Sequence, residues 1–261
     1  MAKKTKDTMA AAAAQQEGRG FLALRDLDFG ATISKEMDGL DAFFERIKMP
    51  SGGATVFQIP SEDPDEPELM KEFSGAILYH HPIRAYFSTE YTGGTNPPDC
   101  GSLDCIEGYG NPGGDCHSCI YNDFGTGKNG AKACKERRRI YLLREGDLFP
   151  VMLSLPTGSL REFSRYIMRL LSKGNKSSDV VTRFSLAKAT NKGGIPYAKA
   201  CFKMERRLTA EELPLIGKLS EQIRNVSQHV GFERGTEASP EEFGTARMQD
   251  AVPAAESRTV A

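Results

Sequence analysis

Five of the six cysteines of this 261-residue chain lie between residues 100 and 134, in a segment rich in glycine. Two of them, Cys116 and Cys119, form a C-x-x-C pair that places two thiolates on one tight turn. Thiolates at this spacing, with others at loop distance, are typical ligands of tetrahedral Zn²⁺. The segment therefore predicts a zinc subdomain with one structural ion.

Two cysteines compete for the last ligand position. Cys134 follows a run rich in glycine and lysine, which is typical of the second half of a zinc ribbon. For the fourth ligand we prefer Cys100, because two prolines precede it at a rigid entry, while Cys105 stays the alternative. The predicted ligands are Cys100, Cys116, Cys119 and Cys134. We expect His117 to point outward from the turn and Cys201 to lie in a core strand.

Several enzyme motifs are missing from the sequence. Neither His80 nor His81 begins the H-x-E that a zinc deaminase needs. The GTGKN run lacks the earlier glycine of a Walker A loop and the Ser or Thr after Lys128. Four thiolates also close the coordination sphere, which makes the zinc structural. We expect no enzyme, although a metal-dependent nuclease, which needs only a few scattered acids, stays an alternative.

The formal net charge of −1 hides a strong asymmetry along the chain. Residues 128–207 hold 19 Lys and Arg against 6 Asp and Glu, an excess of +13, so the remainder carries −14. Much of this acid lies in the loop Ser61–Glu68 and in the last thirty residues. A basic centre suits a polyanionic ligand, and acidic segments can keep the protein soluble or compete for the same surface.

The basic region is interleaved with aromatic residues, as in proteins that bind single strands by base stacking and phosphate contacts. The candidates for phosphate binding are Lys132, Lys135, Arg137, Arg138, Arg139, Arg161, Arg165, Arg169, Lys188 and Lys192. The candidates for base stacking are Tyr121, Phe124, Tyr141, Tyr166 and Tyr197. Phe149, Phe163 and Phe202 have apolar neighbours and are assigned to the core. The mid-chain helix carries only arginines for contact, which suits phosphates and not base readout in duplex DNA.

Short strands dominate the secondary structure that we predict. The segment Phe73–Tyr91 reads as two strands broken at Pro82, because proline cannot donate to a central ladder. Two further strands flank a turn at Glu145–Asp147, and a hairpin turns at Asn191–Gly194.

Two helices follow from capping boxes, in which a hydroxyl and a carboxylate bind the first free amides. Ser159 with Glu162 opens a helix that ends near Gly174, and Thr209 with Glu212 opens another to about Val230. The apolar face of the first helix is Leu160, Phe163, Ile167, Leu170 and Leu171. Together these elements predict a mainly β (α+β) fold: an OB-like Greek-key barrel with an inserted zinc-ribbon subdomain and a C-terminal helix.

Domain organisation follows from composition. Residues 1–20 read as a disordered arm and 231–261 as a disordered tail, around one domain at 21–230 with the zinc insertion at about 97–136. No signal peptide or membrane segment is recognised. Clustered cysteines that bind metal point to a reducing compartment, so we expect a cytoplasmic protein, in a bacterial host, without a membrane partner.

The motifs FFERIKMPSGG, FSGAILYHH, PPDC, GNPGGDCHSCIYNDFG, KAC and LPTGSL resemble a group of phage and conjugative-element proteins taken as single-stranded-DNA-binding-like. The resemblance covers about Phe43 to Val226 and is most specific at the four cysteines. The architecture is similar to that of the T-even phage helix-destabilising protein, where a zinc subdomain interrupts an OB fold. The ligands of that protein include a histidine, which this sequence does not reproduce.

The sequence thus predicts a protein that binds single-stranded DNA, or RNA, with little sequence preference, during replication or recombination of a phage or mobile element. Replication or recombination proteins are its expected partners. A second hypothesis is a zinc-ribbon adaptor or inhibitor that docks on a polymerase or another host protein.

Overall fold

A computed structural model describes residues 20–26, 28–36, 44–50, 53–88, 98–191, 194 and 196–227. Residues 1–19 of the predicted arm at 1–20, and the whole predicted tail at 231–261, lie outside these residues. The N-terminal part contains η1 (Leu22–Asp26), α2 (Phe29–Glu36), β1 (Arg46–Ile47), β2 (Phe57–Ile59), β3 (Glu68–Met70) and β4 (Glu72–Tyr86). The cysteine segment, residues 98–134, contains β5 (Cys100–Ser102), β6 (Glu107–Gly110), β7 (Gly114–Asp115), η2 (Ile120–Asn122) and η3 (Lys128–Gly130). The rest contains β8 (Lys135–Arg144), β9 (Val151–Leu155), α3 (Thr157–Leu171), η4 (Ser177–Asp179), β10 (Val180–Thr190), β11 (Pro196–Arg207) and α4 (Glu212–Ser227).

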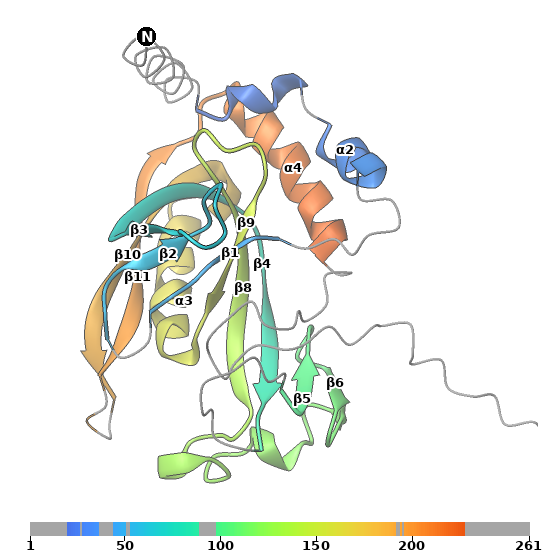
Figure 1. Ribbon diagram of the computed structural model, residues 1–261, viewed down its shortest axis with the longest axis vertical. Helices are drawn as coiled ribbons and strands as arrows, with labels where there is room; N and C mark the ends of the chain where they lie inside the picture. Colours follow the sequence, from blue (N-terminus) through green and yellow to red (C-terminus); the bar gives the residue numbers. More distant parts are fainter. Residues whose placement is uncertain are drawn as a thin grey trace, which may run out of the picture.

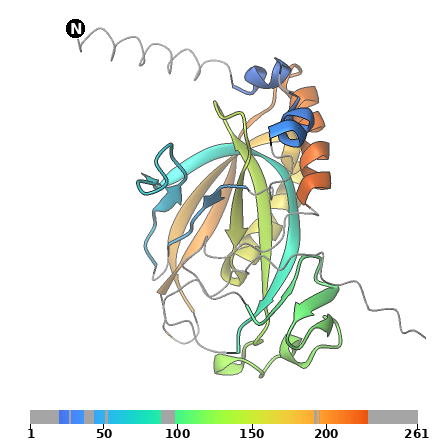
Figure 2. The ribbon, with the colours of Figure 1, turned by 45° about the vertical axis from the view of Figure 1, so that its right-hand side comes forward.

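The fold is mainly β and is organised by one large mixed sheet (Figure 1). Its strand order is β1-β9-β8-β4-β5-β6-β7, and the β10–β11 hairpin also pairs with β4. Among the described strands only β1 and β9 run parallel, and β2 and β3 form a separate two-stranded sheet. Figure 2 shows that the sheet is strongly curved. Within the residues that the structure describes the strands form no closed barrel, so the predicted OB topology is not seen in this sheet.

Both faces of the sheet are covered, because successive residues of each strand point to opposite sides. On β8, Ile140 and Leu142 pack toward Phe163 and Leu170 of α3 in one apolar cluster. Tyr141, Leu143 and their neighbours pack toward Ile216, Leu219 and Ile223 of α4 in a second cluster. The central strands are therefore sandwiched between α3 and α4.

The strand β4 is continuous, which corrects the predicted break at Pro82. On the edge away from β8, β10 pairs only with residues up to Ala76 and β5 begins at Arg84. Pro82 lies in this gap, so β4 has no described partner strand there to receive a donated hydrogen bond. In the same gap, the Ser220 hydroxyl of α4 donates to the Leu78 carbonyl at 2.6 Å. The proline is thus tolerated at a local sheet edge.

The predicted hairpin and one capping box are confirmed. β10 and β11 pair from Val180 with Arg207 to Thr190 with Pro196. In the second box, the Glu212 amide donates to Thr209 Oγ1 at 3.2 Å and the Thr209 amide to Glu212 Oε2 at 2.9 Å. The turn after β8, with Gly146 at a φ of 91°, also lies where it was expected.

The other capping box is wrong. Ser159 lies within the first turn of α3, where its hydroxyl accepts from the buried Ala200 amide of β11 at 2.9 Å. The buried face of the helix contains Tyr166, while Leu171 is 53 % exposed. Phe163 and Phe202 are buried as predicted, but Phe149 is 44 % exposed and only rests against Phe29. Ser159 thus joins α3 to the hairpin.

Candidate metal centre and nucleic-acid interface

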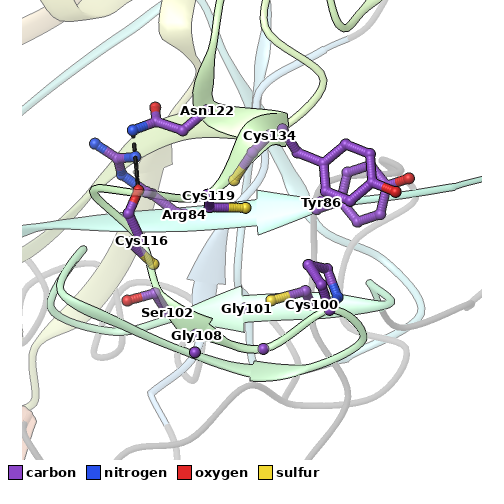
Figure 3. A pocket seen from close by; sticks show the side chains of 14 residues that line it. Arg84, Tyr86, Cys100, Gly101, Ser102, Gly108, Cys116, Cys119, Asn122 and Cys134 are labelled. Carbon is purple, nitrogen blue, oxygen red and sulfur yellow. Dashed lines mark hydrogen bonds between the residues drawn. The ribbon is translucent and has the colours of Figure 1, made fainter.

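The four predicted zinc ligands line one small cavity in the cysteine segment (Figure 3). Cys100 comes from β5, Cys116 and Cys119 from the turn between β7 and η2, and Cys134 from the residue before β8. In Figure 3 their sulfur atoms point toward a common space. The cavity has a volume of about 10 Å³, the size of a single small sphere. The fold therefore gathers thiols that are up to 34 residues apart in the sequence.

Glycine makes room for two of the sulfur atoms. A Cβ on Gly108 would lie 3.0 Å from Cys100 Sγ and 3.6 Å from Cys116 Sγ, and 3.4 Å from the Gly114 carbonyl. Both sulfur atoms thus border the same point on β6, and a larger residue there would require Cys100 Sγ to move by a few tenths of an ångström. The neighbouring Gly110 has a φ of +110°, and a Cβ there would lie 2.1 Å from the Asp99 carbonyl. The β5–β6 hairpin can follow this course only with glycine at position 110.

Hydrogen bonds hold the C-x-x-C turn in place. The carboxylate of Asp115 accepts from the amides of His117 and Ser118 at 3.0 and 3.1 Å. The Asn122 side chain donates to the Cys116 carbonyl at 3.0 Å. The amide of Cys134 donates to the Tyr121 carbonyl at 2.8 Å, which brings the fourth thiol to the turn. The turn and the start of β8 are therefore fastened to each other by backbone and side-chain contacts around the cavity.

Burial favours the protonated form of two of these thiols, Cys100 and Cys134. Burial raises the pKa of Cys134 to about 12, although the positive charge of Arg84 opposes the shift. Burial also raises the pKa of Cys100, and the nearby Cys116 and Cys119 thiols add to the effect. A bound metal cation would reverse this preference, because thiolates and not thiols are metal ligands. The cavity is therefore a place where binding of a metal would release protons.

The sulfur atoms do not have metal-binding spacing. Within the part of the chain that the structure describes, no group of three or more His, Cys, Asp or Glu side chains could hold a metal ion as it stands. A tetrahedral site with Zn–S bonds of about 2.3 Å needs sulfur atoms about 3.8 Å apart. The four thiols thus share a cavity without the spacing of a metal centre, and the zinc site stays a prediction.

The remaining cysteines and His117 lie outside the cavity lining. Cys105 has a left-handed backbone, with a φ of 65°, and burial raises its pKa to about 11 while a hydrogen bond with Arg84 opposes the shift. His117 is exposed, and Cys201 is half-buried on β11. The structure thus groups Cys100, and not Cys105, with the other three candidate ligands.

Two of the predicted phosphate-binding arginines are buried, which corrects the predicted basic cluster after Cys134. Arg137 and Arg139 are 3 % and 2 % exposed, and Arg137 donates to the buried Ser154 hydroxyl at 3.1 Å. Arg138 points to the opposite face, where it donates to His80 at 3.0 Å and lies over the Phe163 ring. Because β8 is a central strand, its consecutive arginines alternate between covered faces and cannot form one surface.

Two of the predicted stacking tyrosines are also buried. Tyr141 is fully covered and packs against Phe44, with ring centres 5.0 Å apart. Tyr166 is 2 % exposed, and its hydroxyl forms a 2.7 Å hydrogen bond with Thr182. Tyr197 is half-buried, with its ring over Gly158, where a Cβ would lie only 2.8 Å away. Neither Tyr141 nor Tyr166 is accessible to a base.

The remaining basic candidates lie on three separate elements. Lys132 and Lys135 are half-buried and precede or begin β8, and Lys135 donates to the Lys132 carbonyl. Arg161, Arg165 and Arg169 are exposed along α3, and Lys188 is exposed near the end of β10. Lys192 lies outside the described residues.

Two of the predicted aromatic candidates, Phe124 and the half-buried Tyr121, lie in the cysteine segment. Phe124 is 80 % exposed, and Lys132 Nζ lies 5.1 Å from its ring centre. Tyr121 stacks on Tyr86 with ring centres 4.1 Å apart and an angle of 16° between the planes. A hydrogen bond between their side chains, together with burial, raises the pKa of Tyr86 to about 12.

Sequence reasoning missed Tyr86 and Arg84, which both line the thiol cavity. Both residues lie on the part of β4 that follows Pro82. Because we expected the strand to break at Pro82, we had no reason to place them beside the cysteines. Arg84 donates to the Cys116 carbonyl at 3.4 Å (Figure 3). The sequence signal that could have placed them is the alternation of apolar and polar residues at positions 83–86, which is typical of a continuous strand.

No family model, curated protein or solved structure matches this chain. None of the helices in the described ranges combines the length and apolar composition needed to cross a bilayer.

Proposed function

We propose that the chain binds single-stranded nucleic acid, with DNA as the primary ligand, through the aromatic and basic surface of its cysteine segment. The observation that carries this proposal is Phe124, a ring 80 % exposed with the Lys132 ammonium 5.1 Å from its centre. A base can stack on such a ring while the ammonium binds the adjacent phosphate. Phenylalanine is among the residue types most often buried, so a ring this uncovered beside a cation is a candidate contact for a ligand.

The stacked Tyr86–Tyr121 pair supports the same interpretation. Both rings line the thiol cavity, and Tyr121 precedes Phe124 by three residues in the cysteine segment. Sequence-tolerant binding needs ring faces and cations, because every base has a π face and every nucleotide a phosphate. Lys128 and Lys135 add positive charge on either side of Lys132 in the sequence.

The four cysteines are proposed to hold one structural Zn²⁺ that keeps this surface rigid. The ligands would be Cys100, Cys116, Cys119 and Cys134, whose side chains share the cavity. Zinc bound by four thiolates has no open position, so its contribution would be to the folding of the segment. A reducing compartment such as the bacterial cytoplasm would keep these thiols available. The OB-like relationship and a role in replication or recombination of a mobile element belong to the same hypothesis.

Fluorescence anisotropy with labelled oligo-dT tests the binding surface. We expect Phe124→Ala to weaken binding roughly 5- to 150-fold, which corresponds to the loss of one base stack. Phe149→Ala, which removes another exposed phenylalanine at 44 % exposure, is the matched control and should leave the affinity unchanged. Duplex DNA and RNA of the same length report the preferred strand.

The salt dependence gives an independent measurement. The logarithm of affinity should fall linearly with the logarithm of salt concentration, with a slope of about −0.7 for each phosphate neutralised. Affinity that is independent of salt, or equal affinity of the Phe124→Ala variant and the wild type, would refute the proposed surface.

Metal analysis of protein purified without oxygen tests the zinc site. We expect one zinc per chain, lost in Cys119→Ser and retained in Cys105→Ser and Cys201→Ser. Retention of zinc in the Cys119→Ser variant, or its absence from the wild type, would contradict the proposed ligand set.

A second candidate function is docking on a protein partner, as the adaptor hypothesis predicts. It is favoured by the aliphatic side chains of the cysteine segment, because Ile106 and Ile120 are 59 % and 65 % exposed. Nucleic acid makes little use of such side chains, whereas protein interfaces bury them. If oligonucleotides do not bind, the full chain as bait for a polymerase or another host protein is the next experiment.

A further inference from the structure

The exposed face of α3 combines positive charge with large apolar side chains. Arg161, Arg165 and Arg169 follow one another at four-residue intervals, so each lies about one turn from the next. Between and beside them, Met168 and Leu171 are 64 % and 53 % exposed. We call these five residues the α3 outer face. Single exposed apolar residues are common, but two neighbours set among three arginines indicate a covered surface.

Within the described residues, the arginines of this face have little to neutralise them. Arg165 pairs with Glu162 on the same helix at 3.2 Å, while in the described residues Arg161 and Arg169 have no ion-pair partner. Phosphates alone could bind these arginines, but a phosphate backbone offers no cover for Met168 and Leu171. The occupant of the α3 outer face should therefore supply both carboxylates and an apolar side chain.

The turn between β2 and β3 has this composition. Its exposed residues include Glu62, Asp63, Asp65, Glu66, Glu68 and Leu69, which we call the acidic hairpin. Leu69 is 67 % exposed, which is similar to the exposed fractions of Met168 and Leu171 on the α3 outer face. Glu68 lies 3.7 Å from Arg144, and Glu62, Asp65 and Glu66 have no ion-pair partner within the described residues.

The acidic hairpin is ordered in a way that presents its side chains outward. The Ser61 hydroxyl donates to the carbonyls of Asp63 and Glu66 at 2.8 and 2.7 Å. The Asp65 amide donates to the Asp63 carboxylate at 3.0 Å. At its base, Phe57 and Ile59 are buried in the core beneath the hairpin. Figure 2 shows the turn projecting from the body of the molecule, so a second molecule can reach it.

We propose that the acidic hairpin of one copy binds the α3 outer face of a second copy of this chain. The two surfaces are complementary in charge, and each offers exposed apolar side chains for the centre of the contact. No ion pair among the described residues joins them within one copy. The contact joins two different surfaces. If it forms reciprocally, the pair closes as an isologous two-fold dimer, and if it forms in one direction only, it is heterologous and continues as a ring or a row of copies.

Sedimentation velocity of the full chain without nucleic acid tests this association. Complexes should form at about 0.1 M salt and weaken at about 1 M salt, where the screening length falls from about 10 to about 3 Å. Two charge-reversal variants, Arg161→Glu/Arg165→Glu and Asp65→Lys/Glu66→Lys, should each weaken self-association at least about tenfold. Lys203→Glu/Arg207→Glu, which makes the same charge change on exposed positions of β11, should associate as the wild type does.

Mixing the two charge-reversal variants gives the decisive measurement. The altered α3 outer face of the first variant is acidic, and the altered hairpin of the second variant is basic, so these two surfaces attract each other. The equimolar mixture should therefore form a complex that neither variant forms alone. A chain that stays monomeric at both salt concentrations would overturn the proposal, whatever its affinity for oligonucleotides. Loss of oligo-dT binding in the Arg161→Glu/Arg165→Glu variant of such a monomer would assign the α3 outer face to nucleic acid instead.

Discussion

Replacement of Glu212 by glutamine should reveal how the last helix is held to the sheet. The Glu212 side chain is buried at the start of α4, where it receives two hydrogen bonds from Arg206 of β11, at 2.7 and 2.9 Å. It also accepts from the amides of Thr209 and Phe21, at 2.9 and 3.4 Å. Glutamine keeps the size of this side chain but removes its charge and replaces one accepting oxygen with an NH2 group, so Glu212→Gln removes the ion pair together with two of the four accepted hydrogen bonds.

The pKa of the carboxyl gives the magnitude. Hydrogen bonds from Arg206 lower the pKa of Glu212 from 4.5 to about 2, against the opposing effect of burial. Since one pKa unit corresponds to about 1.4 kcal/mol, the ionised form stabilises the fold by about 3 kcal/mol at neutral pH. The folded pKa lies below the unfolded one, so this stability is present above about pH 4.5 and is lost as the pH falls toward 2.

Urea unfolding of the wild type and Glu212→Gln at several pH values between about 7 and about 2.5 measures this effect. The difference in unfolding free energy should be about 3 kcal/mol at about pH 7 and should shrink steadily below about pH 4.5. Glu221→Gln, on an exposed position of the same helix, is the control and should differ little from the wild type at any pH. A difference that is negligible at neutral pH, or that does not change with pH, would refute the reasoning.

Three further predictions follow from buried or crowded positions. Gly108→Ala should reduce the amount of bound zinc, because the new Cβ would lie 3.0 Å from Cys100 Sγ. The control Gly217→Ala, which adds a Cβ in open space on α4, should leave the zinc content unchanged. Equal zinc content in both variants would contradict the packing argument. Ser159→Ala should lower the unfolding free energy by about 1–3 kcal/mol, because the buried Ala200 amide loses its acceptor, whereas the exposed Ser164→Ala should change it little in the same urea titration. Burial, followed by the charges of Arg138 and Arg139, lowers the pKa values of His80 and His81 from 6.5 to about 4. As the pH decreases, the histidines of the unfolded chain therefore bind protons before those of the folded chain. The free energy of unfolding should fall by up to about 3 kcal/mol per histidine between about pH 6.5 and about pH 4. A free energy of unfolding that stays constant over this range, in the wild type and in His81→Gln alike, would argue against buried neutral histidines.

Local patterns were sufficient wherever neighbours in the sequence make the structure. The β10–β11 hairpin and the Thr209–Glu212 capping box depend on residues that are close along the chain, and both are present. The thiol quartet was also nominated from spacing and glycine content, and the structure brings these four side chains to one cavity.

The solvent exposure of individual side chains could not be predicted from such local patterns. The run Arg137–Arg139 looks like a basic surface in the sequence, yet two of its side chains are buried because β8 lies between β4 and β9. Pro82 looks like a strand break, yet β4 continues because its free edge happens to lie there. Ser159 looks like a helix cap, yet its hydroxyl serves the distant Ala200.

The sequence by itself thus determined the mainly β composition, the late hairpin, the final helix and the identity of the clustered thiols, since each depends on residue type and short-range spacing. Only the tertiary structure decided which arginines and tyrosines reach solvent, and that Tyr86 lies beside Tyr121. The physical reason is that a side chain becomes accessible or buried through strand order and through the helices that cover each face, which join residues far apart in the chain.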